Sequence, residues 1–345
     1  MQKLVGNERR NRFDGWYTIQ FSSCFLLSAL FCVSPSLQNS TRAAEIAVEK
    51  SEHGATVKID GQLFTEYRTR SGTKPILWPV VGPTGQAVTR SYPVDAFLGP
   101  SENKDHIHHR SLWFTHGDVD GISFWHETGT HGTIQHRRFD TVQSGAPGVI
   151  VTSNDWIGPH GRKILEDQRT LRFDTDGDSR WIDFDVTMTA NDKPVRFGDT
   201  KEGSLGIRVA GTMKVEAQPG GQIVNSEGHK DEQAWGKAAA WVDYHGPVDG
   251  KTVGIAILNH PNSFRHPTYW HVRTYGLLAA NPFGLNDFTS GAKQGSYTLP
   301  AGESITLRYR ILLHQGDQVE GKVAEAYAAY AATKPDGNVK PSSDE

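Results

Sequence analysis

The sequence predicts an all-β protein, a large antiparallel β-sandwich with one helix near its C-terminus. Three observations support this prediction. Apolar and polar residues alternate through residues 181–188. Short apolar runs recur at intervals of about 8–15 residues, separated by turn-forming residues. Finally, apolar residues recur at the spacing of a helix over only one long stretch.

The clearest strand signal lies in residues 181–188. Ile182, Phe184, Val186 and Met188 alternate with polar residues, the period of two that a strand with one buried face shows. Many short strands with few helices favour a sandwich. Further strands are expected at residues 56–59, 148–157, 165–173, 206–215, 239–244, 253–258 and 304–313.

The helix is expected near the C-terminus, where Asp317 can cap it. Residues 334–345 are polar and contain proline and glycine, which predicts a disordered tail. No linker divides residues 45–333, so we expect them to form a single domain. The residues at helical spacing are Val319, Val323, Ala326, Tyr327 and Tyr330.

Residues 1–44 are typical of a secretory signal peptide. A basic start precedes an apolar run at 21–33 and a polar stretch that suits cleavage after Ala43. The run is short for a membrane span, but the polar stretch after it is longer than usual. An uncleaved N-terminal anchor is therefore the alternative, and the one route to a membrane. Both cysteines, Cys24 and Cys32, lie here. We therefore expect a periplasmic or secreted protein without disulfides.

Composition and motifs argue against several functions. The chain has a net charge of −3 and no run of lysines or arginines, which argues against a nucleic-acid partner. It contains no phosphate-binding loop, dinucleotide fingerprint or nucleophile elbow. No nucleotide cofactor is therefore expected, and a neutral small molecule or a bound cation fits better than a polyanion.

Histidines are concentrated in one segment of the chain. Seven of the 15 histidines lie between residues 106 and 136. His106 and His108 point to one face of an extended backbone and, with His116, could hold a divalent metal. The same histidines could instead line a polar sugar cleft or only form hydrogen bonds within loops, so a divalent metal is one of three open alternatives.

A mechanism without a metal also fits this segment. Histidine can act as general acid or base near neutral pH, and we expect this of His109 and His116, with Glu127 as carboxylate partner. Arg110 would orient a hydroxyl or carboxylate of the substrate. The neighbouring Trp125 and His126 combine aromatic and polar character, as a sugar-binding wall requires.

A second polar and aromatic segment, residues 259–271, follows the strand expected at 253–258. We expect it to form another wall of the same pocket, so that both segments converge on one concave face. The predicted residues are His260, as a catalytic group, and Arg265, His266, Trp270 and His271, as substrate contacts. Lys201, Glu202 and Arg208 are weaker candidates, because charged loop residues usually face solvent.

Three motifs together resemble a known family. They are DHIHHRSLWFTHGDVDG at residues 105–121, NHP at 259–261 and HPTYWHVRTYGL at 266–277. The pattern resembles the bacterial PmoA-like family, a family of unknown function with a methane oxygenase label, over roughly residues 50–315. Asp120 and Ser123 depart from its usual Asn and Asp, which weakens a carboxylate role at 123. The resemblance implies a galactose-mutarotase-like supersandwich and an association with sugar catabolism.

Three functions remain open from the sequence. The first is an exported carbohydrate-active enzyme, an isomerase, lyase or hydrolase, that uses acid–base chemistry at a histidine-rich cleft. The second is a metal-dependent oxygenase or hydrolase that uses the same histidines. The third is a sugar-binding protein without catalysis.

Overall fold

The computed structural model describes residues 18–20 and 43–334. The chain divides into two units, Met1–Arg42 and Ala43–Glu345, and everything below concerns the second. The predicted signal run at 21–33 and the tail at 335–345 lie outside the described residues. Signal peptide, domain bounds and tail therefore stay predictions.

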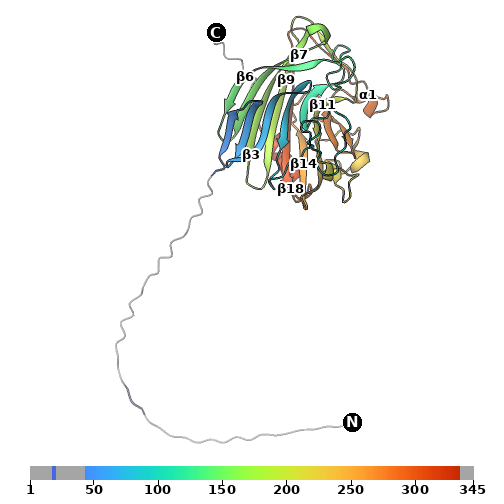
Figure 1. Ribbon diagram of the computed structural model, residues 1–345. Coiled ribbons are helices and arrows are strands. Elements are labelled where there is room, and N and C mark those ends of the chain that lie inside the picture. The colour runs from blue at the N-terminus through green and yellow to red at the C-terminus, as the bar shows by residue number, and fades with distance from the viewer. Residues whose placement is uncertain (1–17, 21–42, 335–345) are drawn as a thin grey trace, which may run out of the picture. The chain divides into compact units, whose positions relative to one another are not determined.

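The first of two large sheets contains eight antiparallel strands (Figure 1). Its central strands β5, β11 and β16 pair through long-range contacts, because they lie far apart in the sequence. In spatial order the strands are β1 (Ile46–Lys50), β2 (Gly54–Ile59), β3 (Gln62–Ser71), β4 (Lys74–Val80), β5 (Leu112–His116), β11 (Gly203–Arg208), β16 (Leu277–Asn281) and β15 (Tyr269–Arg273).

The second large sheet also contains eight antiparallel strands, and a two-stranded ribbon accompanies the sheets. In spatial order the second sheet has β12 (Gln222–Asn225), β13 (Trp241–Val248), β14 (Lys251–Asn259), β18 (Ser304–Gln315), β9 (Arg180–Thr189), β8 (Lys163–Thr175), β7 (Gly148–Ile157) and β6 (Thr133–Gln143). The ribbon pairs β10 (Val195–Phe197) with β17 (Tyr297–Leu299).

The C-terminal helix is present but shorter than the sequence predicts. It is α2 (Val323–Ala331), and it packs Val323 and Tyr330 on the outer face of the second sheet. Asp317 instead accepts the backbone N–H groups of Val319 and Glu320 in a preceding turn. The short helices are α1 (Leu285–Phe288), η1 (Pro159–Gly161), η2 (Gly211–Met213) and η3 (Asp231–Ala234).

The main core lies between the two sheets. On β9 the alternating residues Ile182, Phe184, Val186 and Met188 are buried in it, as the sequence predicts. The strand expected at 206–215 ends at Arg208, because the chain turns into η2. The all-β sandwich is confirmed. Among the described residues, no helix has the length and apolarity needed to cross a membrane.

A smaller apolar cluster covers the opposite face of the first sheet. Trp113 on β5 and Leu277 and Ala279 on β16 belong to it, with Ile76 and Trp125. On the same strands Phe114, Leu278 and Ala280 point into the main core. The central strands β5, β11 and β16 are therefore buried on both faces, and their outer cluster supports the site described next.

Candidate functional site

The outer face of the first sheet carries a cleft with a volume of about 430 Å³. Its walls come from four places: the loop before β5, the loop after it, the loop before β11, and the end of β15 with the turn that follows. The lining residues are His106, His108, His109, His126, Lys201, Glu202, His271, Arg273, Thr274 and Tyr275. Five histidines thus surround one cavity.

Two buried arginines hold the histidine loop in place. Arg90 donates to the backbone carbonyls of His106 and His109, at 2.9 Å each, and to the Asp105 carboxylate at 2.5 Å. Arg208 on β11 donates to both oxygens of Asp105, at 3.1 and 3.0 Å. Although burial opposes its charge, Asp105 has a lowered pKa because both guanidinium groups stabilise the carboxylate.

Arg208 also fixes the protonation state of His109. Its Nη1 lies 3.1 Å from His109 Nδ1. A guanidinium can only donate, so Nδ1 must be the acceptor and the ring proton sits on Nε2. Burial, followed by the nearby His108 and Arg208, lowers the pKa of His109 well below its usual value. His109 is therefore a neutral imidazole.

The floor of the cleft is a set of parallel rings. His106 stacks on His109 with ring centroids 4.8 Å apart, and Tyr275 stacks on His106 at 5.0 Å. Beneath them the Trp113 indole lies parallel to His109 at 5.2 Å. The indole fits because residue 206 of the neighbouring strand has no side chain: a Cβ at Gly206 would lie 2.5 Å from its Cζ2.

The Gly206→Ala substitution should therefore destabilise the fold and disturb the cleft. The added methyl group must displace the Trp113 indole, and overpacking of this kind costs about 1–3 kcal/mol. Urea unfolding should report the loss of stability, and histidine-ring NMR should report a shift of the His109 signals. An alanine variant with wild-type stability and unchanged His109 signals would contradict the packing described here.

The opposite wall carries His108 and His126. Their rings meet edge-on with centroids 4.9 Å apart, and His126 Nδ1 lies 3.2 Å from Ser123 Oγ. Burial, together with the nearby His126 and Lys74, lowers the pKa of His108 to about 3. His108 is thus neutral at neutral pH, and its two ring nitrogens have no hydrogen-bond partner among the described residues.

The remaining wall combines Lys201, Glu202, His271 and Arg273. Arg273 Nε donates to His271 Nε2 at 3.2 Å, so His271 Nδ1 carries the proton and donates to the Lys201 carbonyl at 2.9 Å. Burial lowers the pKa of His271 to about 4 although Glu202 opposes this. Burial opposes the charge of Glu202, but His271 and Lys201 outweigh it and lower its pKa. The wall therefore holds one ionised carboxylate and neutral imidazole.

These lowered pKa values predict a flat histidine titration. The ring signals of His108 and His271 should stay constant from about pH 5.5 to 8, whereas an unperturbed imidazole titrates near about 6.5. Each ring should become protonated only as the pH falls toward its lowered pKa, and it would then no longer accept a proton. Histidine-ring NMR, assigned with the His108→Gln and His271→Gln variants, measures this. A midpoint near 6.5 for either ring would contradict the electrostatics of the cleft.

Several of the predicted site residues do come together. His106, His108, His109, His126 and His271 all line the cleft. Trp125 lies directly beneath it, fully buried, with its ring 5.5 Å from that of His109. The two histidine-containing segments therefore meet at the cleft, but the second segment, 259–271, contributes only its last residue, His271.

His116 lies apart from the cleft because of strand alternation. On β5 the side chains of Phe114 and His116 point inward, whereas those of Trp113 and Thr115 point to the cleft side. His116 Nε2 lies 2.9 Å from the Gly198 carbonyl, and its ring packs against Phe283. The position does not fit the acid–base or metal role that the sequence suggests for His116.

Glu127 and Arg110 form a buried ion-pair cluster instead of lining the cleft. Arg110 binds the carboxylate through Nε, at 2.9 and 3.0 Å, and through Nη2 at 2.7 Å. Lys74 Nζ adds a second cation at 2.7 Å. Both oxygens of Glu127 are thus occupied by protein, which does not fit a carboxylate that exchanges protons with a substrate.

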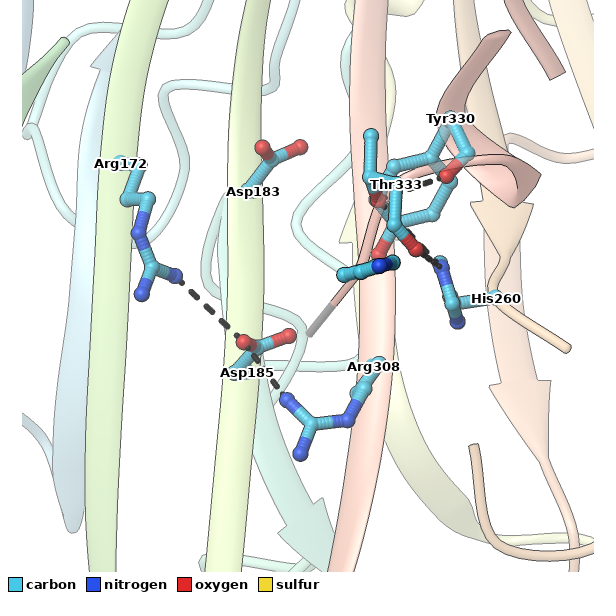
Figure 2. A pocket seen from close by; sticks show the side chains of 8 residues that line it. Arg172, Asp183, Asp185, His260, Arg308, Tyr330 and Thr333 are labelled. Carbon is cyan, nitrogen blue, oxygen red and sulfur yellow. Dashed lines mark hydrogen bonds and ion pairs between the residues drawn. The ribbon is translucent and has the colours of Figure 1, made fainter. Parts of the chain in front are cut away.

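His260 belongs to a different cavity on the outer face of the second sheet (Figure 2). There its Nε2 lies 3.2 Å from the Thr333 carbonyl, and Asp185 binds Arg308 at 2.9 Å. This cavity measures about 170 Å³. Because Asp185 and His271 lie on opposite outer faces of the sandwich, His260 cannot share a substrate with the histidine cleft.

The other residues of the second segment have structural partners. Arg265 donates to the carbonyls of Pro282 and Ser296 at 3.0 and 3.1 Å, and also to that of Gly295. His266 contacts Asn259 Oδ1 at 3.0 Å. Trp270 is buried in the main core and donates to the Ala239 carbonyl. None of the three reaches the cleft.

The metal alternative has no assembled ligand set in the part of the chain that the structure describes. No group of three or more histidine, cysteine, aspartate or glutamate side chains is placed there to hold a metal ion. His106 and His108 are near each other, with centroids 5.7 Å apart, but His116 does not join them. The predicted set His106, His108 and His116 is therefore not formed.

Sequence reasoning missed three important residues and undervalued three others. Arg90, Arg273 and Tyr275 received no role, although Arg273 and Tyr275 lie within the quoted motif at 266–277. Lys201, Glu202 and Arg208 were expected to face solvent, yet Arg208 is 2% exposed. A useful signal for Arg208 was its place inside a strand of otherwise apolar residues, where a charged side chain needs a buried partner.

Comparison with solved structures finds distant likenesses to glycoside hydrolases. The galactosidase domain of the α-galactosidase–sucrose kinase AgaSK has 10% identity and a TM-score of 0.33, over 80% of this chain and 40% of that one. A glycoside hydrolase family 97 enzyme from Pseudoalteromonas sp. strain K8, in complex with acarbose, has 12% identity and a TM-score of 0.28, over 78% and 34%. The GH36 α-galactosidase AgaB from Geobacillus stearothermophilus has 12% identity and a TM-score of 0.28, over 79% and 41%.

The chain thus spans about two fifths or less of each of these proteins, and likenesses at these scores carry no conclusion about function. No curated protein matches the sequence. The family comparison gives a clear result over residues 54–329, which contain both sheets except β1, and nearly all of α2. The matching family carries no methane oxygenase name, so that part of the resemblance is not supported. The chain belongs to the family of unknown function DUF6807.

Proposed function

We propose that the histidine cleft is the active site of a carbohydrate-active enzyme that moves a proton on a sugar or modified glycoside. One observation supports this most strongly: five histidines, an ionised carboxylate and two cationic side chains surround a single cavity of about 430 Å³. Small-molecule sites have this size and this convergence of polar groups. A sugar offers both hydroxyl groups for the polar side chains and an apolar ring face for aromatic ones.

The roles of the residues follow from which nitrogens are free. His271 uses both ring nitrogens for protein contacts, so its role is to position Arg273. One ring nitrogen of His126 contacts Ser123 Oγ, and the other is available to a ligand. Both ring nitrogens of His108 are available. We assign proton transfer to His126, in place of the buried His109 and His116. His108 would form a hydrogen bond with the substrate, because its pKa of about 3 makes it a weak base. Glu202 replaces Glu127 as the carboxylate of the site.

This enzyme would act outside the cytoplasm. The basic start, apolar run and small residues of 1–44 support export to the periplasm or medium. Sequencing the N-terminus of the protein after expression in a bacterial host tests this part alone: cleavage after Ala43 is expected, and an intact Met1 in a membrane fraction would favour the anchor.

Activity screening of purified variants tests the enzymatic proposal. The protein is incubated with panels of oligosaccharides, glycosides and uronic acids, and NMR detects epimerised, eliminated or hydrolysed products. We expect His126→Ala to lose about 100-fold or more in kcat/KM, the usual contribution of general acid–base catalysis. His108→Ala should lose about 10-fold, as for a missing hydrogen bond to the substrate. His260→Ala, from the other face of the sandwich, is the matched control and should retain activity. Loss in the control with full activity in both cleft variants would refute the assignment.

A further inference from the structure

Arg273 differs from the other charged residues that line the cleft, because it has no carboxylate partner. Lys201 and Glu202 neutralise each other at 3.0 Å. Arg273 makes its one side-chain hydrogen bond through Nε, to the neutral His271. Among the described residues, nothing binds the two Nη groups that form the outer fork of its guanidinium.

The position of this guanidinium is nevertheless fixed. Its Cζ lies 5.0 Å from the centre of the Trp235 ring, in a cation–π contact. Its backbone is paired to Leu277 in the first sheet, and His271 orients Nε. All three contacts are with uncharged groups, so they hold the side chain without neutralising its charge.

Arg265 provides a contrast within the same segment. It also has no carboxylate partner among the described residues, but its Nη groups donate to three backbone carbonyls. Arg265 is therefore satisfied by the fold. Arg273 is ordered to a similar degree and keeps both Nη groups available on the wall of a cavity.

The charge around the cleft points in the same direction. Arg90 and Arg208 share a single carboxylate, Asp105, and Lys74 and Arg110 share Glu127. The region thus has more cationic than anionic groups, in a chain whose net charge is −3. A cleft of one sign raises the local concentration of ligands of the opposite sign.

We infer that the ligand of this cleft carries a carboxylate group that binds the Nη fork of Arg273, so that the substrate class is an acidic sugar, a uronic acid or its glycoside. The inference rests on the proposed function and deepens it. A planar carboxylate matches the guanidinium fork with two parallel hydrogen bonds. A single free guanidinium fork on the cavity wall, beside the ionised Glu202, suits a monoanion better than a phosphate dianion.

Calorimetric titration of the full chain at low salt tests this. The probes are glucuronate, galacturonate and mannuronate, each with its neutral parent sugar, and glucose 6-phosphate. At least one uronate should bind about 10- to 100-fold more tightly than its parent, the usual range for a charged hydrogen bond. Arg273→Gln should remove that difference, and Arg273→Lys should retain part of it. Arg162→Gln, an exposed arginine elsewhere, should leave it unchanged, and unfolding curves check that each variant is folded.

The outcomes separate this inference from the proposed function. Parent sugars that bind as tightly as every uronate, with affinity lost in His126→Ala, would overturn the inference and leave the proposed function standing. Tighter binding of glucose 6-phosphate than of any uronate would overturn the carboxylate assignment. Absence of binding by the whole panel would overturn both.

Discussion

Replacing Asp105 with asparagine should lower the free energy of unfolding by about 2–3 kcal/mol and abolish most ligand binding in the cleft. Asp105 is the carboxylate that Arg90 and Arg208 share. Both guanidinium groups are almost fully buried, with 2% of each side chain exposed. Without the carboxylate they repel each other, and each loses a strong hydrogen bond.

The effect on the cleft follows from what these arginines hold. Arg90 fixes the carbonyls of His106 and His109, and Arg208 fixes the His109 ring. We therefore expect the loop at 105–109 to shift and the affinity for ligand to fall by about 100-fold or more. Urea unfolding and calorimetric titration measure the two effects.

Glu49→Gln is the matched control for Asp105→Asn. It also removes a carboxylate from an ion pair, but the Glu49–Lys58 pair is exposed at 63% and 40%. Exposed pairs contribute about 0–1 kcal/mol. If Asp105→Asn has the same free energy of unfolding and the same ligand affinity as Glu49→Gln, the ion pairs of Asp105 with Arg90 and Arg208 do not maintain the cleft.

Replacing Asp243 with asparagine should cost about 3–5 kcal/mol of stability, because it breaks a fully buried ion pair. Asp243 accepts from His245 Nδ1 at 2.6 Å and from His314 Nε2 at 2.7 Å. His314 Nδ1 also donates to the Gln315 carbonyl at 3.2 Å. Both nitrogens of His314 therefore carry protons, and the ring is an imidazolium. Gly254 lies on β14, between β13 and β18, and a Cβ at this position would overlap with the His314 ring.

The pH dependence of this loss has a defined sign. Burial opposes the charge of His314, but Asp243 outweighs it and raises the pKa of His314. A raised histidine pKa stabilises the fold fully below the unfolded value of about 6.5 and stops doing so as the pH rises through the folded value. The pKa of Asp243 is lowered, mainly by His314 against the effect of burial, so its contribution is lost only in acid. The stability difference between wild type and Asp243→Asn should therefore be larger at pH 5.5 than at pH 9.

Urea unfolding at the two pH values measures this difference. Asp178→Asn removes an exposed carboxylate from the β8–β9 turn and should change stability by less than about 0.5 kcal/mol. A difference for Asp243→Asn that is equal at both pH values would show that His314 is not charged in the fold.

The sequence predicts the second sheet better than the first, for a physical reason. On β9 one face is buried and one is wet, so the residues alternate visibly. On β5, β11 and β16 every residue is buried, because the cleft and the Trp113 cluster cover the outer face. A strand buried on both sides has no period of two to detect, and these are the strands that support the site.

The place of the site was predictable, but the roles of several residues were not. A concentration of histidines indicates a functional region without any knowledge of strand bounds. Whether His116 faces the cleft or the core depends on which alternate residues of β5 point inward, and local composition does not reveal this. One of the two cations that bind Glu127 is Lys74, 53 residues away. The separation of His260 from His271 depends on which sheet each residue adjoins.

The response of individual histidine rings to a bound sugar tests most directly whether the cleft is the substrate site. Histidine-ring NMR spectra are recorded on the full chain while a bound member of the uronate panel is added. If the cleft is the substrate site, the signals of His108, His126 and His271 should shift in proportion to occupancy, whereas those of His260 and His314 should not. Shifts confined to His260, with the cleft histidines unchanged, would place the substrate on the other face of the sandwich and contradict its binding in the cleft.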